Sequence, residues 1–224
     1  MRLYYIQGSP FARMVRVLLR ELNIACDEIE ITDFPPPRDY FTINPLGQVP
    51  VLETDGGRLF PTSVILEFLM SMSPTRHSER GDRALAILLR REDHYWRDGQ
   101  LFAALLTWGD FVCTSRYMEW AGLRASGGNV LGFVPAERNR ERISTSLDWL
   151  ESVVTPSGFL PEVLSVQDIV FACFILWTES RGPIEWHGRP KLEALVTRLE
   201  NRPSFRETAP QPWRPHPLVI SPTG

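Results

Sequence analysis

The stretch Asn44-Pro45-Leu46-Gly47-Gln48-Val49-Pro50-Val51-Leu52 places a proline at the head of an apolar, strand-like run. Proline cannot donate to a sheet ladder, so Pro50 is expected at a sheet edge or at an exposed bend. A cis Val49–Pro50 bond turns the Val49 backbone N–H and C=O outward, where an extended peptide can pair with them. The alternative is a trans proline that ends a loop, since only about 5% of such bonds are cis. We predict the cis bond.

A helix with one polar face precedes this stretch. The apolar positions of residues 11–22 follow helical spacing, with Ser9 as the N-cap and Pro10 in the first turn. Three arginines fall on the face opposite the apolar stripe: Arg13, Arg16 and Arg20.

The first 75 residues predict an α+β layer. Residues 2–6 and 28–31 have strand patterns, and Asp55-Gly56-Gly57 indicates a hairpin between residues 49–53 and 58–60. Thr62 or Ser63 is then expected to cap a helix with Val64, Ile65, Phe68 and Leu69 on one face. The resulting order of βαβ, a connection and ββα is that of an α+β domain, which we assign to residues 1–75.

Beyond a linker at residues 71–79, the sequence predicts an all-α domain over residues 80–206. Helical patterns cover residues 80–108, 135–154, 164–177 and 191–200, and a glycine-rich loop is expected at residues 122–132. The helix at 164–177 is apolar nearly all round, which predicts burial on every side, and Ser165 with Asp168 forms a capping-box pattern at its start. The chain from Pro203 is expected to be irregular and to end in a Pro-rich tail at residues 207–224.

Composition narrows the function classes. The hydrophobic share of 43% and the charged share of 23% are those of a globular protein. A net charge of -3 argues against a dedicated nucleic-acid binder, and no membrane span or secretory signal is evident. Cys26, Cys113 and Cys173 lack the spacing of a zinc site or a disulfide framework, so a reducing cytoplasm fits best.

Two helix starts in the first domain carry candidate chemistry. A helix N-terminus favours an anion, and the Ser9 hydroxyl in that field can donate a hydrogen bond to a thiolate and lower the pKa of the thiol. Thr62 and Ser63 offer hydroxyls and free N–H groups to a carboxylate at the second helix start. At both helix starts, the alternative is that the hydroxyl only caps the helix and binds no ligand.

The motifs, in this order and spacing, resemble those of the cytosolic glutathione transferases, and the opening is most similar to serine-type classes such as tau. The motifs that carry the resemblance are Ser9-Pro10-Phe11, Asn44 to Pro50, Thr62-Ser63, Ser165-Val166-Gln167-Asp168 and Arg202-Pro203-Ser204-Phe205. The resemblance spans residues 2–206 and implies a thioredoxin-like α+β N-terminal domain followed by an all-α C-terminal domain.

The resemblance also implies the roles of the site residues. Ser9 would activate the glutathione sulfur, Val49 would pair with the peptide backbone before cis Pro50, and Ser63 would hold the γ-glutamyl carboxylate. Phe11, Gln48 and Thr62 complete the glutathione-binding set that we expect. The family most often has Glu-Ser where this chain has Thr62-Ser63, so one acidic contact to the γ-glutamyl group is missing.

The function implied is a glutathione S-transferase that adds glutathione, its co-substrate, to a small hydrophobic electrophile, with no metal or prosthetic group. A cytoplasmic homodimer with a role in detoxification is expected, with Arg80, Arg83, Arg90 and Arg91 as an interface element or a solvated face. The alternatives are a non-catalytic binding protein of the same fold and a glutathione-dependent isomerase or dehalogenase. Thiol–disulfide exchange is disfavoured because Ser9 cannot form a mixed disulfide.

Two further groups of residues have side chains that could carry chemistry. His94 and Asp98 lie one helical turn apart, but a metal ion is usually held by three or four ligands, so a packed or solvated helix face is favoured. Four aromatic residues are candidates for lining the electrophile pocket or for the helical core: Phe102, Trp108, Tyr117 and Trp120.

Overall fold

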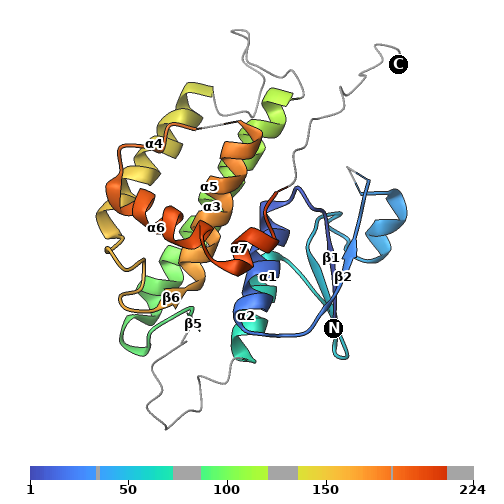
Figure 1. The fold of residues 1–224 in the computed structure, drawn as a ribbon. Coiled ribbons are helices and arrows are strands. Elements are labelled where there is room, and N and C mark those ends of the chain that lie inside the picture. Colours follow the sequence, from blue (N-terminus) through green and yellow to red (C-terminus); the bar gives the residue numbers. More distant parts are fainter. Residues whose placement is uncertain (34–35, 73–86, 121–135, 183, 211–224) are drawn as a thin grey trace, which may run out of the picture.

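The computed structural model describes residues 1–33, 36–72, 87–120, 136–182 and 184–210 (Figure 1). The expected boundary between residues 75 and 80, the glycine-rich loop at 122–132 and Pro135 lie outside the described residues. Most of the Pro-rich tail, from residue 211 onward, also lies outside them.

A four-stranded mixed sheet forms the first layer. Its order is β2 (Asp27–Glu30), β1 (Arg2–Tyr5), β3 (Val51–Thr54) and β4 (Gly57–Leu59). β1 pairs in parallel with β2 and antiparallel with β3, and β3 pairs antiparallel with β4 as the predicted hairpin. Leu3 and Leu52 lie opposite each other in this register, and both are fully buried. The sequence-based strand predictions are therefore confirmed.

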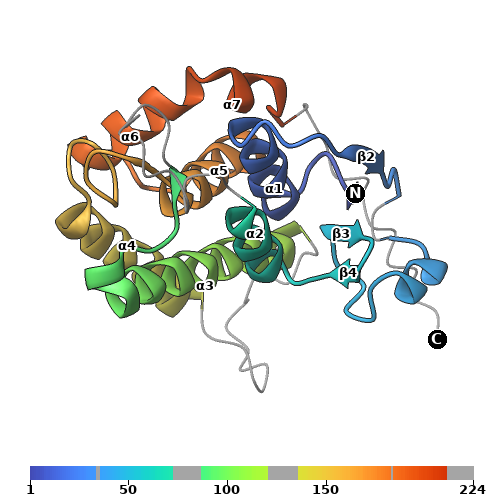
Figure 2. The same ribbon diagram turned by 90° about the horizontal axis from the view of Figure 1, so that it is seen from below.

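Two helices lie between this sheet and the helical part of the molecule. α1 (Pro10–Glu21) and α2 (Thr62–Ser71) pack against each other, and Figure 2 shows both between β3 and β4 on one side and α3 and α5 on the other. A short 3-10 helix, η1 (Arg38–Thr42), lies in the connection from β2 to β3.

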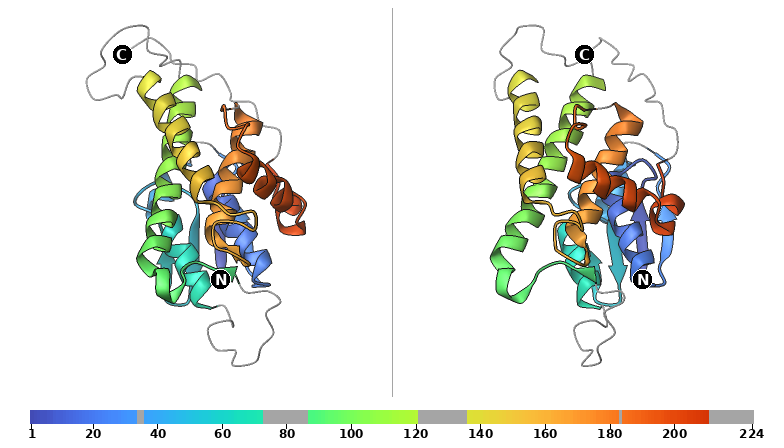
Figure 3. Two further views of the ribbon diagram at one scale, coloured as in Figure 1. Left: turned by 90° about the vertical axis from the view of Figure 1, so that its left-hand side faces the viewer. Right: turned by 60° about the vertical axis from the view of Figure 1, so that its left-hand side comes forward.

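The helical part is built around α5 (Val166–Arg181), which packs against α1, α3 (Tyr95–Trp120) and α6 (Pro190–Glu200). Nearly every side chain of α5 is buried, as its apolar pattern predicts. α3 and α4 (Ala136–Val153) run side by side (Figure 3), and α7 (Pro203–Glu207) packs against α1. The prediction of a thioredoxin-like layer followed by a helical part is confirmed.

Three local predictions are wrong. Residues 87–94 hold no long helix: β5 (Ile87–Leu88) pairs in parallel with β6 (Leu164–Ser165), and η4 (Glu92–His94) precedes α3. The chain after Pro203 is not irregular throughout, because α7 begins there with proline in its first turn. The α2 N-cap is Pro61, and neither Thr62 nor Ser63 caps the helix.

The polar face of α1 is buried as well as its apolar face. Arg13 is 5% exposed and Arg16 is 7% exposed, because α1 is covered by the sheet on one side and by α5 and α7 on the other. In α2, Val64 is 43% exposed, while Leu66 is buried with Ile65 and Leu69. Among the described residues, no helix is long and apolar enough to span a membrane.

Candidate functional site

A cavity of about 540 Å³ lies between the sheet layer and the helical part. Its walls are drawn from residues 6–11, 30–32, 44–50 and 61–63, from residues 106–117 of α3, and from Trp177 and Arg181 of α5. The structure brings all seven site residues predicted from the sequence to this one cavity: Ser9, Phe11, Gln48, Val49, Pro50, Thr62 and Ser63.

Ser9 is the N-cap of α1 and lines the cavity at the same time. The Ala12 backbone N–H donates to Ser9 Oγ at 3.2 Å, which confirms the predicted cap. A serine hydroxyl has one donor proton and two acceptor lone pairs, so this bond leaves its O–H available. Among the described residues, that O–H has no hydrogen-bond acceptor. Capping and donation into the cavity are therefore compatible at Ser9.

The Val49–Pro50 bond is cis, as predicted. Asn44 braces the preceding loop: its Nδ2 donates to the Gln48 carbonyl at 2.6 Å, and its Oδ1 accepts from the Leu46 N–H at 3.0 Å. Gly47 has φ +62°, and a Cβ there would lie 2.8 Å from the Phe41 ring, so the turn requires glycine. No hydrogen bond joins the Val49 N–H or C=O to any other described backbone group outside the strands.

The start of α2 forms a second polar wall. Thr62 and Ser63 follow a second cis bond, Phe60–Pro61, which was not predicted from the sequence. Because Pro61 provides no side-chain cap, the first backbone N–H groups of α2 are open to a ligand. The Thr62 and Ser63 hydroxyls make no hydrogen bond to another described residue, so they are not used in capping.

The far wall of the cavity comes from α3 and α5. Of the four aromatic candidates, Tyr117 lines the cavity, whereas Phe102 and Trp108 are buried in the core. The side chain of Trp120 lies outside what the structure describes. Burial raises the pKa of Tyr117, so its hydroxyl is protonated at neutral pH.

Two cavity residues of α5 were missed from the sequence. Trp177 and Arg181 lie at the C-terminal end of a helix whose pattern indicates only core. Trp177 Nε1 donates to the Gly8 carbonyl at 2.9 Å, and a Cβ on Gly8 would lie 3.3 Å from Arg181 Nη2. The sequence does hold a signal for them: both are polar-tipped side chains, one helical turn apart, at the end of an otherwise apolar helix.

Burial raises the pKa of all three cysteine thiols. Cys113 lines the cavity but is buried, and burial raises the pKa of its thiol. Burial likewise raises the pKa of Cys173 to about 12 and that of Cys26 above its usual range. All three are free, and Cys113 and Cys173 are buried, as small hydrophobic side chains are.

Asp98, one of the two candidate metal ligands, is paired with an arginine. Asp98 is 2% exposed and accepts hydrogen bonds from the Arg91 backbone N–H, Nε and Nη2 at 2.7–2.9 Å. Arg90 donates to Glu67 at 2.7 Å, so Arg90 and Arg91 both pair within the chain, and Arg80 and Arg83 lie outside the described residues. No group of three candidate metal ligands is found among the residues that the structure describes.

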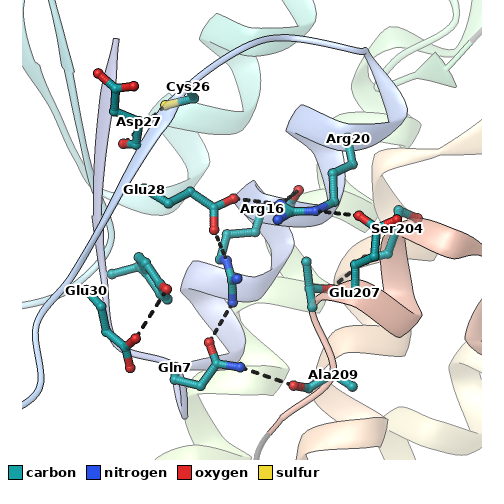
Figure 4. A network of polar contacts seen from close by, with 12 residues as sticks. Gln7, Arg16, Arg20, Cys26, Asp27, Glu28, Glu30, Ser204, Glu207 and Ala209 are labelled. Atoms are coloured by element: carbon teal, nitrogen blue, oxygen red, sulfur yellow. Dashed lines mark hydrogen bonds and ion pairs between the residues drawn. The ribbon is translucent and has the colours of Figure 1, made fainter.

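A polar network supports the cavity wall before Ser9 (Figure 4). Arg16 donates to Gln7 Oε1 at 2.8 Å and to Glu28 at 2.7 Å, and Gln7 Nε2 donates to the Ala209 carbonyl at 3.2 Å. Burial opposes ionisation of Glu28, but hydrogen bonds from Arg20 and Arg16 outweigh it and hold the pKa of Glu28 below its usual range. The network therefore joins the segment after β1, β2, α1 and the segment after α7.

The sequence of this chain is similar to those of known proteins. Residues 3–77 match the family model of the glutathione S-transferase N-terminal domain. The chain is 28% identical over 215 residues to the uncharacterized GST-like protein YibF of Escherichia coli, covering 94% of this chain and 98% of the relative.

Two solved structures cover nearly all of the chain. A glutathione transferase family member from Pseudomonas fluorescens, solved with bound glutathione, is 25% identical with a TM-score of 0.71, over 94% of this chain and 98% of the other. A glutathione S-transferase from Methylobacterium radiotolerans, in complex with glutathione sulfonate, is 22% identical with a TM-score of 0.73, over 98% and 99% of the two chains.

Proposed function

This chain belongs to the glutathione transferase superfamily, and we propose that it binds glutathione in the cavity around Ser9 and adds the glutathione sulfur to a hydrophobic electrophile. The observation that carries the proposal is that one cavity gathers Ser9, the outward backbone of Val49 and the open start of α2. The related protein from Pseudomonas fluorescens, solved with glutathione bound, supports the ligand.

Each part of the cavity matches one part of the tripeptide. The Val49 N–H and C=O would pair with the glutathione backbone beside cis Pro50. Ser63 and the free N–H groups of α2 would hold the γ-glutamyl carboxylate, because a helix N-terminus favours an anion. Phe11, Gln48 and Thr62 would complete the contacts from neighbouring positions on the same wall.

The chemical step that we propose centres on Ser9. Its O–H donates to the glutathione sulfur at the N-terminus of α1, so the thiolate is favoured and the thiol proton leaves to solvent. A free thiol has a pKa of about 8.5, and each unit of lowering corresponds to about 1.4 kcal/mol. The sulfur lone pair then forms the bond to the electrophilic carbon, and the displaced electron pair leaves with the leaving group or enters the acceptor's π system.

The electrophile would lie against the helical wall. Leu106, Tyr117 and Trp177 give this wall its apolar character, next to the Ser9 loop that Trp177 contacts through Gly8.

We propose a division into a glutathione-binding domain at residues 1–75, a helical domain at 80–206 and a tail at 207–224. We also propose a cytoplasmic homodimer that acts in detoxification.

One observation favours a second candidate, a glutathione transferase-like binding protein without catalytic activity. The family most often has a glutamate at the position of Thr62, and Thr62 supplies only a hydroxyl to the same wall. A glutathione-dependent isomerase or dehalogenase would use the same first domain. A panel of electrophiles, assayed for thioether formation, isomerisation and halide release, separates these reactions.

The test of the proposed function begins with glutathione binding. A thermal-shift titration should show stabilisation that reaches about 2.7 kcal/mol at a glutathione concentration of 100 times the Kd. Absence of any shift would overturn the glutathione site as a whole. Binding without turnover on any electrophile of the panel would favour the non-catalytic protein.

Substitution of Ser9 tests the catalytic assignment. Ser9→Ala should raise the pKa of bound glutathione toward its free value and lower turnover about 10²-fold or more, the scale of losing one positioned donor. Glutathione binding should weaken much less, and loss of the cap should cost about 1 kcal/mol of stability. The matched control is Ser152→Ala, an exposed serine of α4. A Ser9→Ala protein with full turnover would leave Ser9 with capping alone.

A further inference from the structure

The turn before Ser9 contains a peptide plane that is hydrogen-bonded at both ends. The Ser9 N–H donates to the Ile6 carbonyl at 3.0 Å, and the Gly8 carbonyl of the same peptide accepts from Trp177 Nε1 at 2.9 Å. Rotation of this plane changes ψ of Gly8 and φ of Ser9, so it moves the Ser9 side chain. Glycine opposes such a rotation less than other residues do. The two hydrogen bonds therefore help to fix where Ser9 Oγ lies.

Trp177 is a rigid donor for this bond. The residue is 2% exposed, and its ring packs edge to face against Tyr117, with 6.2 Å between the ring centroids. About one turn earlier on α5, the ring of Phe174 packs edge to face against Phe11 of α1, with 5.1 Å between the centroids. The helix α5 therefore contacts the chain on both sides of Ser9.

We propose that Trp177 is a positioning residue for Ser9, whose indole N–H holds the Gly8 carbonyl so that the Ser9 O–H is directed at the glutathione sulfur. This inference rests on the proposed function, since the sulfur is the group that Ser9 would activate. A displacement of about 1 Å near a reacting group can cost about 10²-fold in rate, so a bond that fixes this turn should affect turnover. The role is separate from the apolar surface that Trp177 offers to the electrophile.

The alternative is that the bond only satisfies a buried indole, because a buried tryptophan N–H usually has a partner. Burial alone does not require one in this protein: Trp108 Nε1 is buried and has no hydrogen-bond partner among the described residues. A purely structural bond would contribute to stability and leave the thiol unchanged. A positioning bond also changes the pKa of bound glutathione.

The first test is the pKa of bound glutathione, measured from thiolate absorbance against pH. No electrophile is present, so loss of the apolar surface of Trp177 does not affect the result. Trp177→Phe should raise this pKa by about half a unit or more and lower kcat about tenfold. The KM for glutathione should change less than about twofold, because the proposed contacts at Val49 and at the start of α2 remain. An unchanged thiol pKa would overturn the proposal.

The matched control is Trp186→Phe. Trp186 is 4% exposed and its Nε1 donates to Glu179 at 3.2 Å, so this variant also loses a buried ring and an indole hydrogen bond. Trp186 does not line the cavity, and the thiol pKa and kcat should stay as in the wild type. An equal rise of the thiol pKa in both variants would overturn a specific role for Trp177.

A double substitution shows whether Trp177 acts through Ser9. In the Ser9→Ala background, Trp177→Phe should add less than about 0.2 units to the thiol pKa, because the hydroxyl that it positions is absent. The full rise in both backgrounds would mean that Trp177 acts on the sulfur without Ser9, and it would overturn the positioning role.

Amide hydrogen exchange of the glutathione-free protein separates this inference from the proposed function. The Ala12 N–H donates to Ser9 Oγ at 3.2 Å, so its exchange rate reports where the hydroxyl lies. Trp177→Phe should exchange the Ser9 and Ala12 amides about tenfold faster than the wild type does, and Trp186→Phe should not. If Trp177→Phe does not fold, β-(3-benzothienyl)alanine at position 177 keeps the ring shape without the N–H.

The two failures give different results. A wild-type protein that binds no glutathione would overturn the proposed function, and exchange of the Ser9 and Ala12 amides still decides whether Trp177 positions Ser9. Equal exchange in the wild type and in the variant at position 177 would overturn the role of Trp177, even where glutathione binds and reacts.

Discussion

Thr62 and Ser63 show how one helix start can be left open to a ligand. Both residues follow Pro61, which is the N-cap of α2 but has no side chain that accepts a hydrogen bond. Thr62 is 7% exposed, and its hydroxyl has no partner among the described residues although it lies on the cavity wall. The hydroxyl can therefore donate to or accept from a polar ligand in the cavity.

Thr62→Val is therefore expected to separate binding from stability. Valine keeps the shape of threonine and removes only a hydroxyl that makes no hydrogen bond within the described protein. The free energy of unfolding should change by less than about 0.5 kcal/mol. Glutathione affinity should fall about two- to tenfold, the scale of one hydrogen bond, as measured by calorimetric titration. The control is Thr107→Val, on the exposed side of α3. Unchanged glutathione affinity in Thr62→Val would remove Thr62 from the binding set.

At the scale of elements, the start of α5 is defined by a reciprocal capping box. Ser165 Oγ accepts from the Asp168 N–H at 3.1 Å, and Asp168 Oδ2 accepts from the Ser165 N–H at 2.9 Å, which confirms the predicted capping box. Asp168 Oδ1 also accepts from the Phe159 N–H at 2.8 Å. Burial raises the pKa of Asp168 to about 6, against the effect of these hydrogen bonds.

Ser165→Ala tests the contribution of this cap. The substitution removes the acceptor of the buried Asp168 N–H, so stability should fall by about 1 kcal/mol, within a range of 0.5–2. Chemical denaturation measures the change, with the exposed Ser152→Ala as the reference substitution. Glutathione binding should be little affected, because Ser165 does not line the first cavity. A change near zero would mean that the cap adds nothing to α5.

At the scale of the whole molecule, a segment near the C-terminal end of the described chain is attached to α1. Glu21 accepts from Arg202 Nε and Nη2, both at 2.7 Å, and from the Ser204 hydroxyl at 2.5 Å. Burial opposes ionisation of Glu21, but the hydrogen bonds from Arg202 and Ser204 outweigh it and lower its pKa. This bidentate pair attaches the start of α7 to the end of α1, away from the cavity at the other end of that helix.

The Glu21 pair predicts a pH dependence of stability. Because folding lowers the pKa of Glu21, its contribution is present above the unfolded-state pKa of about 4.3 and is lost as the pH falls through the folded-state value. Glu21→Gln should remove that part of the dependence and cost about 1.5–3 kcal/mol at neutral pH, since hydrogen bonds to a charged group are lost. Denaturation curves between pH 3 and 7 (roughly the range that spans the titration) measure both effects.

The matched control for this pair is Glu67→Gln, which breaks the more exposed ion pair with Arg90. Surface pairs contribute about 0–1 kcal/mol, so this variant should stay close to the wild type at neutral pH. Equal losses in the two variants would contradict a special role for the contact between α1 and α7.

Short-range chemistry made much of the chain predictable from sequence. Four local features form as predicted, and each depends on neighbouring residues: the Ser9 N-cap before Pro10, the cis Val49–Pro50 bond, the Asp55-Gly56-Gly57 hairpin and the Ser165 capping box. Their order along the chain also indicated the family, and with it the residues that now line one cavity. Local backbone preferences and capping hydrogen bonds act within a few residues, so a single sequence carries them.

Tertiary structure alone decided the features that depend on distant partners. Ile87 and Leu88 form a strand because β6 lies beside them, and Arg13 and Arg16 are buried because α5, α7 and the sheet enclose α1. Trp177 joins the cavity through a hydrogen bond to Gly8, 169 residues earlier in the chain. Helical spacing tells which side chains share a face, but burial and hydrogen-bond partners depend on what packs against that face, and segments far apart in the sequence provide those neighbours.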